Sequence, residues 1–319
     1  MNDRTEISRR RLLGATGAAV VGAALPAVAR AESGAKPAPP FRHCLNTGTI
    51  RGQKVGLARA VEIAAAAGYT GIEPWIEEIA VYQQGGGSLP DMRKKIADLG
   101  ITVESAIGFA RWISDDENER REGLEQAKRD MELVKAIGGE RIAAPPAGAT
   151  DKPGLDLLQA AGRYRALLEA GAQIGVVPQL ELWGFSQNLH RLGQVAFVAI
   201  ESGHPQACVL PDVYHIYKGG SDFAGLRLFN GLAMHAFHVN DYPADPPRAT
   251  INDSHRVFCG DGVAPLSEIL QTIHASGFRG ALSLELFNQD YYRRDPLAVA
   301  REGLEKTKAA VAKAGFVPG

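Results

Sequence analysis

From Phe41 onward, eight short β-rich runs alternate with stretches that have the apolar spacing of amphipathic helices. This alternation is typical of a parallel sheet covered by helices. Eight βα units close into a barrel, so we predict a single (β/α)8 TIM barrel of the α/β class, although 319 residues alone would suggest two domains. The predicted strands are His43–Thr47, Gly71–Trp75, Thr102–Gly108, Arg141–Ala144, Val176–Leu182, Ala207–Asp212, Ala233–Asn240 and Ala281–Leu286.

Helices are predicted between these strands, and several of them end at a glycine that can form the left-handed cap. The alternative architecture is an open doubly wound sheet. It is disfavoured because no G-x-G-x-x-G motif follows the first strand, and the Gly85–Gly87 triplet is interpreted as a flexible loop. The predicted helices are Gly56–Ala67, Leu89–Leu99, Asn118–Ile137, Leu155–Ile174, Leu189–Glu201, Gly225–Asn230, Pro265–Ala275 and Pro296–Ala314.

The N-terminus has the features of an export signal. Residues 8–13 contain three arginines followed by two leucines, an apolar stretch rich in small residues comes next, and Ala29-Arg30-Ala31 has the form of a cleavage site. This resembles a twin-arginine signal peptide over residues 1–31. A Pro-rich leader (32–40) and the barrel (41–319) follow. We therefore expect a periplasmic or extracellular protein that meets the twin-arginine translocation machinery and has no membrane attachment after cleavage.

Charge and cysteine content exclude other classes of protein. The formal net charge is −1, and removal of residues 1–31 leaves 30 basic and 34 acidic residues, a balance of −4. A nucleic-acid partner is disfavoured because it requires clustered basic residues. The three cysteines are widely separated and lack a C-x-x-C spacing, which argues against a disulfide scaffold or a cysteine-rich zinc site.

Four later strands each place one residue of metal-ligand type near the C-terminal end of the strand, where the sites of TIM barrels form. These residues are Glu181, Asp212, His238 and Glu285. Any one of them alone could be an ion-paired or hydrogen-bonded residue. Together, three oxygen ligands and one imidazole suit one divalent metal ion, namely Mn²⁺, Mg²⁺, Co²⁺ or Zn²⁺.

Further polar and aromatic residues follow the strand ends. His215 comes three residues after Asp212 and can reach a substrate hydroxyl. Trp75, Trp112 and Trp183 suit either stacking on a sugar ring or forming a wall. Glu73 can accept a sugar hydroxyl or pair with an arginine.

The sequence resembles the xylose isomerase-like TIM-barrel family of sugar isomerases and epimerases. The resemblance rests on the four strand-end residues together with Asp212-Val-Tyr-His215, Gly71-Ile-Glu73 and Gly260-Asp-Gly262. The resemblance covers nearly all of residues 41–315. It implies that the four residues bind one divalent metal ion and that His215 contacts the substrate. It also implies a substrate-binding arginine after the metal-binding histidine, for which Arg248 and Arg256 are the candidates.

The chemistry expected of such a site is enolisation. A divalent ion that chelates neighbouring carbonyl and hydroxyl oxygens stabilises an enediolate, and Glu181 and Glu285 would serve as acid and base. We therefore predict an isomerase or epimerase that acts on a small carbohydrate, either a sugar, a keto-sugar or a cyclitol, and that is unphosphorylated. The alternatives are a keto-sugar lyase or dehydratase, a non-catalytic carbohydrate-binding protein and an endonuclease-like relative. Each of these functions is compatible with a protein that forms a homo-oligomer.

Overall fold

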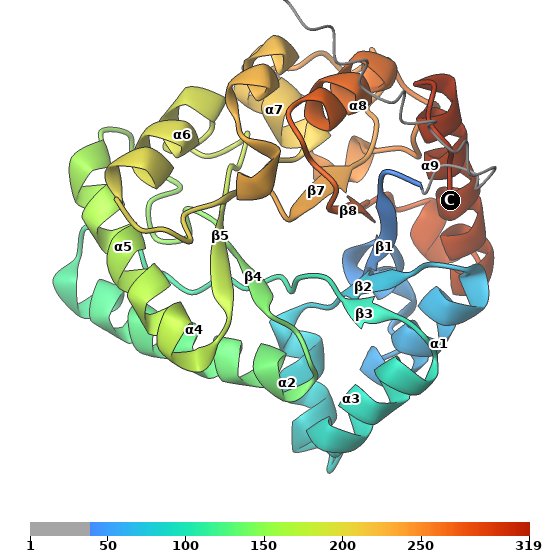
Figure 1. Ribbon diagram of the computed structural model, residues 1–319, viewed down its shortest axis with the longest axis horizontal. Coiled ribbons are helices and arrows are strands. Elements are labelled where there is room, and N and C mark those ends of the chain that lie inside the picture. The colour runs from blue at the N-terminus through green and yellow to red at the C-terminus, as the bar shows by residue number, and fades with distance from the viewer. Residues whose placement is uncertain (1–38) are drawn as a thin grey trace, which may run out of the picture. The chain divides into compact units, whose positions relative to one another are not determined.

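The strands of the computed structural model lie at its centre with helices around them (Figure 1), and the structure describes residues 39–319. All strand pairs are parallel. The strands are β1 (Arg42–Asn46), β2 (Gly71–Glu73), β3 (Thr102–Val103), β4 (Arg141–Ala144), β5 (Val177–Glu181), β6 (Val209–Leu210), β7 (Ala236–Val239) and β8 (Ala281–Leu284).

The strands form two hydrogen-bonded arcs, β3-β2-β1-β8-β7 and β4-β5-β6. Backbone hydrogen bonds join the arcs at both junctions, from Ala143 N to Ala106 O (2.8 Å) and from His238 N to Pro211 O (2.9 Å). The first strand pairs with the last, from Arg42 opposite Ala281 onward. The predicted single (β/α)8 barrel is therefore confirmed.

The helices are α1 (Leu57–Ala67), α2 (Ile76–Gln84), α3 (Leu89–Asp98), α4 (Glu117–Ala136), α5 (Leu157–Ile174), α6 (Leu192–Glu201), α7 (Val213–Gly219), α8 (Leu266–Ala275) and α9 (Pro296–Lys313). Two of them, α2 and α7, were not predicted. Helix α2 buries only Ile79, so its apolar pattern is weak. Helix α7 begins where the Asp212 side chain accepts a hydrogen bond from His215 N (2.8 Å), a cap in residues that were interpreted as a strand end. The predicted helix Gly225–Asn230 is a 3-10 helix over Phe223–Leu228.

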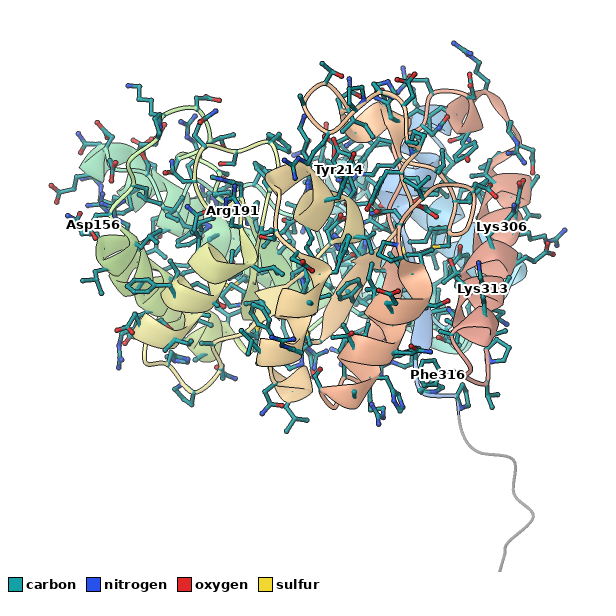
Figure 2. All side chains as sticks on the ribbon, turned by 90° about the horizontal axis from the view of Figure 1, so that it is seen from above. Asp156, Arg191, Tyr214, Lys306, Lys313 and Phe316 are labelled. Carbon is teal, nitrogen blue, oxygen red and sulfur yellow. The ribbon has the colours of Figure 1, made fainter. Side chains whose placement is uncertain are left out.

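Apolar packing fills the layer between helices and strands, and a small separate cluster fills the barrel interior. This inner cluster consists of Ile107, Ala143, Leu210 and Ala236, with Trp75 packed against it. The two faces of the barrel are visible in Figure 2, where Tyr214 of α7 lies near the upper face and Phe316 near the lower one. We call the face at the C-terminal ends of the strands the mouth and the opposite face the base.

The predicted signal peptide (1–31) and residues 32–38 of the leader lie outside the described residues. Within 39–319, no helix combines the length and the apolar character that crossing a membrane requires.

Candidate metal centre at the barrel mouth

Side-chain alternation along the strands directs the four predicted residues into the barrel. Leu210 and Ala236 belong to the inner cluster, and side chains two positions apart on a strand share a face. Asp212 and His238 therefore point inward one step nearer the mouth, and they are opposite each other in an isolated parallel bridge.

The four side chains converge on one nitrogen atom, His238 Nδ1. It lies 3.4 Å from Glu285 Oε2, 3.7 Å from Asp212 Oδ2 and 3.9 Å from Glu181 Oε1. Ligand atoms of Asp212, His238 and Glu285 all lie within 4.8 Å of one another. All four residues are buried, with at most 4% of any of them exposed. The structure thus gathers the predicted set of four at the mouth.

Unpaired polar atoms mark this cluster. Of nine buried side-chain atoms that have no hydrogen-bond partner within the described residues, two belong to it, Glu181 Oε2 and His238 Nδ1, and two more belong to residues in contact with it, Glu73 Oε1 and Arg256 Nε. Buried polar atoms are normally hydrogen-bonded, so such a concentration requires an explanation. A free imidazole nitrogen with three carboxylates around it has the donor set of a divalent metal site. The residues present therefore fit a divalent ion.

Glu73 orients the histidine of this cluster. Its Oε2 lies 3.0 Å from His238 Nε2, so a ring that donates there leaves Nδ1 as the nitrogen that can bind a metal ion. Ser283 Oγ (2.6 Å) and Asn46 Nδ2 (3.0 Å) also donate to Glu73 Oε2. Glu73 does not pair with an arginine as predicted: its side chain is fully buried, its partners are His238, Ser283 and Asn46, and it is not among the residues that line the cavity described below.

The charges in the cluster shift one another's pKa values in opposite directions. Burial raises the pKa of Glu181 to about 8, with the Glu285 and Asp212 carboxylates adding to the effect and His238 opposing it. Burial by itself would lower the pKa of His238, but the charges of Glu73 and Glu285 raise it well above its usual value. The pKa of Glu285 is lowered because His238 and Arg256 outweigh its burial.

Arg256 closes the cluster on the cavity side. Its Nη1 donates to Asp212 Oδ2 (3.0 Å) and Glu285 Oε2 (2.9 Å), and its Nη2 lies 3.0 Å from His215 Nε2. The guanidinium also lies over the Tyr214 ring, 4.5 Å from its centroid. Burial and the neighbouring Arg256 charge lower the pKa of His215, which favours a neutral imidazole in this position.

The long loop after β7 decides between the two arginine candidates. Lys218 Nζ donates to the carbonyl oxygens of Arg248 (3.0 Å), Ala249 (3.1 Å) and Ile251 (2.8 Å), which fixes this segment against α7. The Arg248 side chain is exposed and does not line the cavity, whereas Arg256 does. The prediction of Arg248 as a substrate-binding residue therefore does not agree with the structure.

A cavity of about 290 Å³ opens over the cluster. Of the predicted residues, Trp75, Glu181, Trp183, His215, Arg256 and Glu285 line it. Trp112 does not, because it is buried elsewhere and donates from Nε1 to Pro145 O (2.8 Å). Five lining residues that are aromatic or polar were not predicted from the sequence: Arg51, Phe109, Phe185, Asp253 and Phe287.

A larger cavity of about 680 Å³ lies at the base, along the starts of β4 to β7. In the part of the chain that the structure describes, the group of potential metal ligands lies at the mouth rather than at this base cavity. The smaller cavity at the mouth is therefore the candidate reaction site.

A family model described as xylose isomerase-like TIM barrel matches residues 61–310. The 3-dehydroshikimate dehydratase of Pseudomonas putida is 26% identical over 78% of this chain, which spans 39% of the length of that protein. The inosose isomerase of Bacillus velezensis is 24% identical, with coverage of 85% of this chain and 97% of that protein. A solved structure of the IOLI protein with a zinc atom has a TM-score of 0.79 at 21% identity and covers 86% of this chain and 99% of its own. At this identity, the likeness of the structures shows the fold.

Proposed function

Because the chain belongs to the xylose isomerase-like TIM barrel family, we propose that it is a divalent-metal-dependent isomerase or epimerase of a sugar, keto-sugar or cyclitol. The observation that carries the proposal is the free His238 Nδ1, buried within 3.9 Å of oxygens from Glu181, Asp212 and Glu285. The similarity to an inosose isomerase over nearly its whole length supports the same reaction class.

Glu181, Asp212, His238 and Glu285 are the residues that would hold the metal ion. When bound, a divalent ion supplies a Lewis acid that polarises a substrate carbonyl. Glu73 keeps the His238 ring in place through the Nε2 contact, and Arg256 holds Asp212 and Glu285 from the cavity side.

Two carboxylates are placed to move the proton of an enolisation. Glu181 and Glu285 line the cavity from different strands, so they can face the reacting carbon from different directions. One carboxylate removes the proton and the other returns it, which gives isomerisation or epimerisation according to where the proton is delivered. Glu181 exchanges its proton at the free Oε2, while Glu285 is oriented by Asn46 at Oε1 and by Arg256 at Oε2.

His215 and Arg256 provide polar contacts for substrate hydroxyl groups. Both side chains are buried and line the cavity, and each holds the other through the 3.0 Å contact between Nε2 and Nη2. Trp183 and Trp75 cover the same cavity with apolar surface and reduce the access of water to the carboxylates.

An unphosphorylated substrate is supported by the loop after β7. Phosphate sites in TIM barrels use backbone N–H groups in this region and after β8. Here the amides of Gly260 (3.0 Å) and Ala264 (2.9 Å) already donate to the Asp241 carboxylate. A comparison of kcat/KM for matched free and phosphorylated ketoses tests this claim, and a preference for the phosphorylated member contradicts it.

A dehydratase that uses the same enolisation step is the second candidate. It is favoured by the similarity to 3-dehydroshikimate dehydratase. The product distinguishes the two, because β-elimination releases water and creates a conjugated enone, which absorbs in the ultraviolet, whereas isomerisation and epimerisation do not.

We also propose export through the twin-arginine route. The support for export is the signal-like sequence of residues 1–31. Replacement of Arg9, Arg10 and Arg11 by lysine should retain the protein in the cytoplasm, and N-terminal sequencing of the exported protein should begin near residue 32. Unimpaired export of the lysine variant would contradict this assignment.

The reaction is tested directly by proton exchange. The Mn²⁺-supplied protein is incubated in D₂O with a panel of ketoses, aldoses and inososes, and the loss of the C–H signal next to the carbonyl is followed by NMR. We expect metal-dependent exchange in at least one member of the panel. Absence of exchange across the panel, with the metal bound, would contradict the proposed function.

A further inference from the structure

Four aromatic rings form a continuous rim around the cavity at the mouth. The ring centroids of Trp75 and Phe109 are 5.0 Å apart, those of Phe109 and Trp183 are 5.9 Å apart, and those of Trp183 and Phe185 are 5.2 Å apart. All four residues line the cavity. We call Trp75, Phe109, Trp183 and Phe185 the aromatic rim.

The rim and the floor of the cavity differ sharply in chemistry. The floor carries buried acidic and basic groups, including Glu181, Glu285 and Arg256. The rim instead exposes apolar surface, since Phe109 and Phe185 are each 44% exposed. Exposed apolar surface that adjoins a polar site usually marks a place where a ligand binds.

The rim offers few hydrogen bonds to a ligand. Phenylalanine has no polar atom, and the Trp75 Nε1–H is already donated to Asn46 Oδ1 (3.0 Å). A second sugar placed there would find few hydrogen-bond partners for its hydroxyl groups, whereas an aromatic ring needs none. Aromatic rings attract one another in offset or edge-to-face geometry at centroid distances of about 4.5–7 Å.

Part of the rim is held in place before any ligand arrives. The Arg51 guanidinium lies 4.0 Å from the centroid of the Trp75 ring, and the Phe287 ring packs against Trp75 edge-on at 5.9 Å. A ring that is already ordered loses less conformational freedom on binding, so its contact contributes more to affinity.

We propose that the aromatic rim is an outer subsite for an aromatic aglycone, so that the preferred substrate is an aryl glycoside whose sugar ring carries a keto group and reaches the floor, where enolisation requires that carbonyl. The position of the sugar rests on the proposed function, but binding of the aromatic ring by the rim does not. The subsite therefore extends the substrate class from a free sugar to a glycoside with an apolar ring.

The test compares matched methyl and phenyl β-glycosides of glucose, galactose and xylose by calorimetric titration of the Mn²⁺-loaded protein. We expect the phenyl member of at least one pair to bind about tenfold more tightly or better, from the added aromatic contacts. Phe109→Ala and Phe185→Ala should each reduce this preference several-fold. Phe197→Ala removes a phenylalanine of α6 that is 37% exposed and lies outside the cavity, and this matched control should retain the preference.

Equal affinity for the two members of every pair, no binding of any glycoside, or a preference that survives both rim substitutions would overturn the proposal. Because the titration does not measure turnover, a phenyl preference without proton exchange would contradict the proposed function and support the subsite. Proton exchange in a free sugar without a phenyl preference would support the proposed function and contradict the subsite.

Discussion

The mouth and the base of the barrel both contain buried carboxylates, but they satisfy them differently. At the base, Arg42 Nε and Nη2 donate to the two oxygens of Glu104, each at 2.8 Å, and Thr102 Oγ1 adds a third hydrogen bond. At the mouth, Glu181 Oε2 and His238 Nδ1 have no partner within residues 39–319. A buried charge is costly unless it is paired, so the carboxylate at the base is satisfied within the fold, whereas the mouth retains donor atoms for a ligand.

The largest effect should follow a change at the mouth. Glu285→Gln retains the size of the side chain but removes an acid or base, so kcat should fall by about 100-fold or more while the fold persists. Turnover and metal occupancy are measured on the same preparation, so that loss of metal is not mistaken for loss of proton transfer. Glu104→Gln, at the base, is the matched control and should retain turnover. Full activity of Glu285→Gln would make that residue structural.

Another buried carboxylate, that of Asp130, forms no salt bridge within residues 39–319 and does not line the cavity at the mouth. Asp130 of α4 accepts a hydrogen bond from Gln126 Nε2 (2.5 Å), and its burial raises the pKa to about 6. The folded state therefore retains this proton over a range in which the unfolded state has lost it. Stability contributed by the proton is complete below about pH 4 and is lost as the pH rises to about 6.

Asp130→Asn should remove this pH dependence. At pH 7 we expect the variant to be more stable than the wild type by about 2 kcal/mol, and at pH 4 we expect the difference to be small. Urea denaturation of both proteins at the two pH values measures the effect. An equal difference in the free energy of unfolding at pH 4 and pH 7 would show that Asp130 is ionised in the folded protein with an ordinary pKa.

The smallest expected effect is on the stability of the protein after one substitution at the base and one at the mouth. Glu104→Gln should destabilise the protein by about 1 kcal/mol, a value reduced by solvent because 48% of the Arg42 side chain is exposed. Glu181→Gln should leave the metal-free protein at least as stable as the wild type at neutral pH, because burial raises the pKa of Glu181 to about 8 and glutamine avoids the cost of keeping that carboxyl protonated. Thermal unfolding in the presence of a chelator measures both variants, and equal destabilisation at the two ends would contradict the distinction.

The sequence was sufficient to predict the barrel and the convergence of four residues because both signals are local. Glu181, Asp212, His238 and Glu285 each interrupt an apolar strand near its end, and strand alternation turns them all inward. The roles assigned to these residues remain predictions.

Contacts across the barrel could not be predicted from local sequence patterns. Asn46 reaches Glu285 over 239 positions in the sequence, and Ser283 reaches Glu73 over 210. The contact of Glu73 with His238 could not be predicted because depth inside the barrel has no local signature. The choice between Arg248 and Arg256 depended on the path of a loop that is fixed by three hydrogen bonds from Lys218.

The stoichiometry of bound metal tests the central claim most directly. Wild-type protein, Glu181→Gln, Asp212→Asn and the base control Glu104→Gln are stripped with chelator, dialysed against Mn²⁺ or Zn²⁺ and analysed for metal content. We predict one divalent ion per chain in the wild type and in Glu104→Gln, a marked loss in the two mouth variants, and release at acidic pH as the ligands become protonated. Undiminished metal in both Glu181→Gln and Asp212→Asn would contradict the assignment of the mouth as a metal centre.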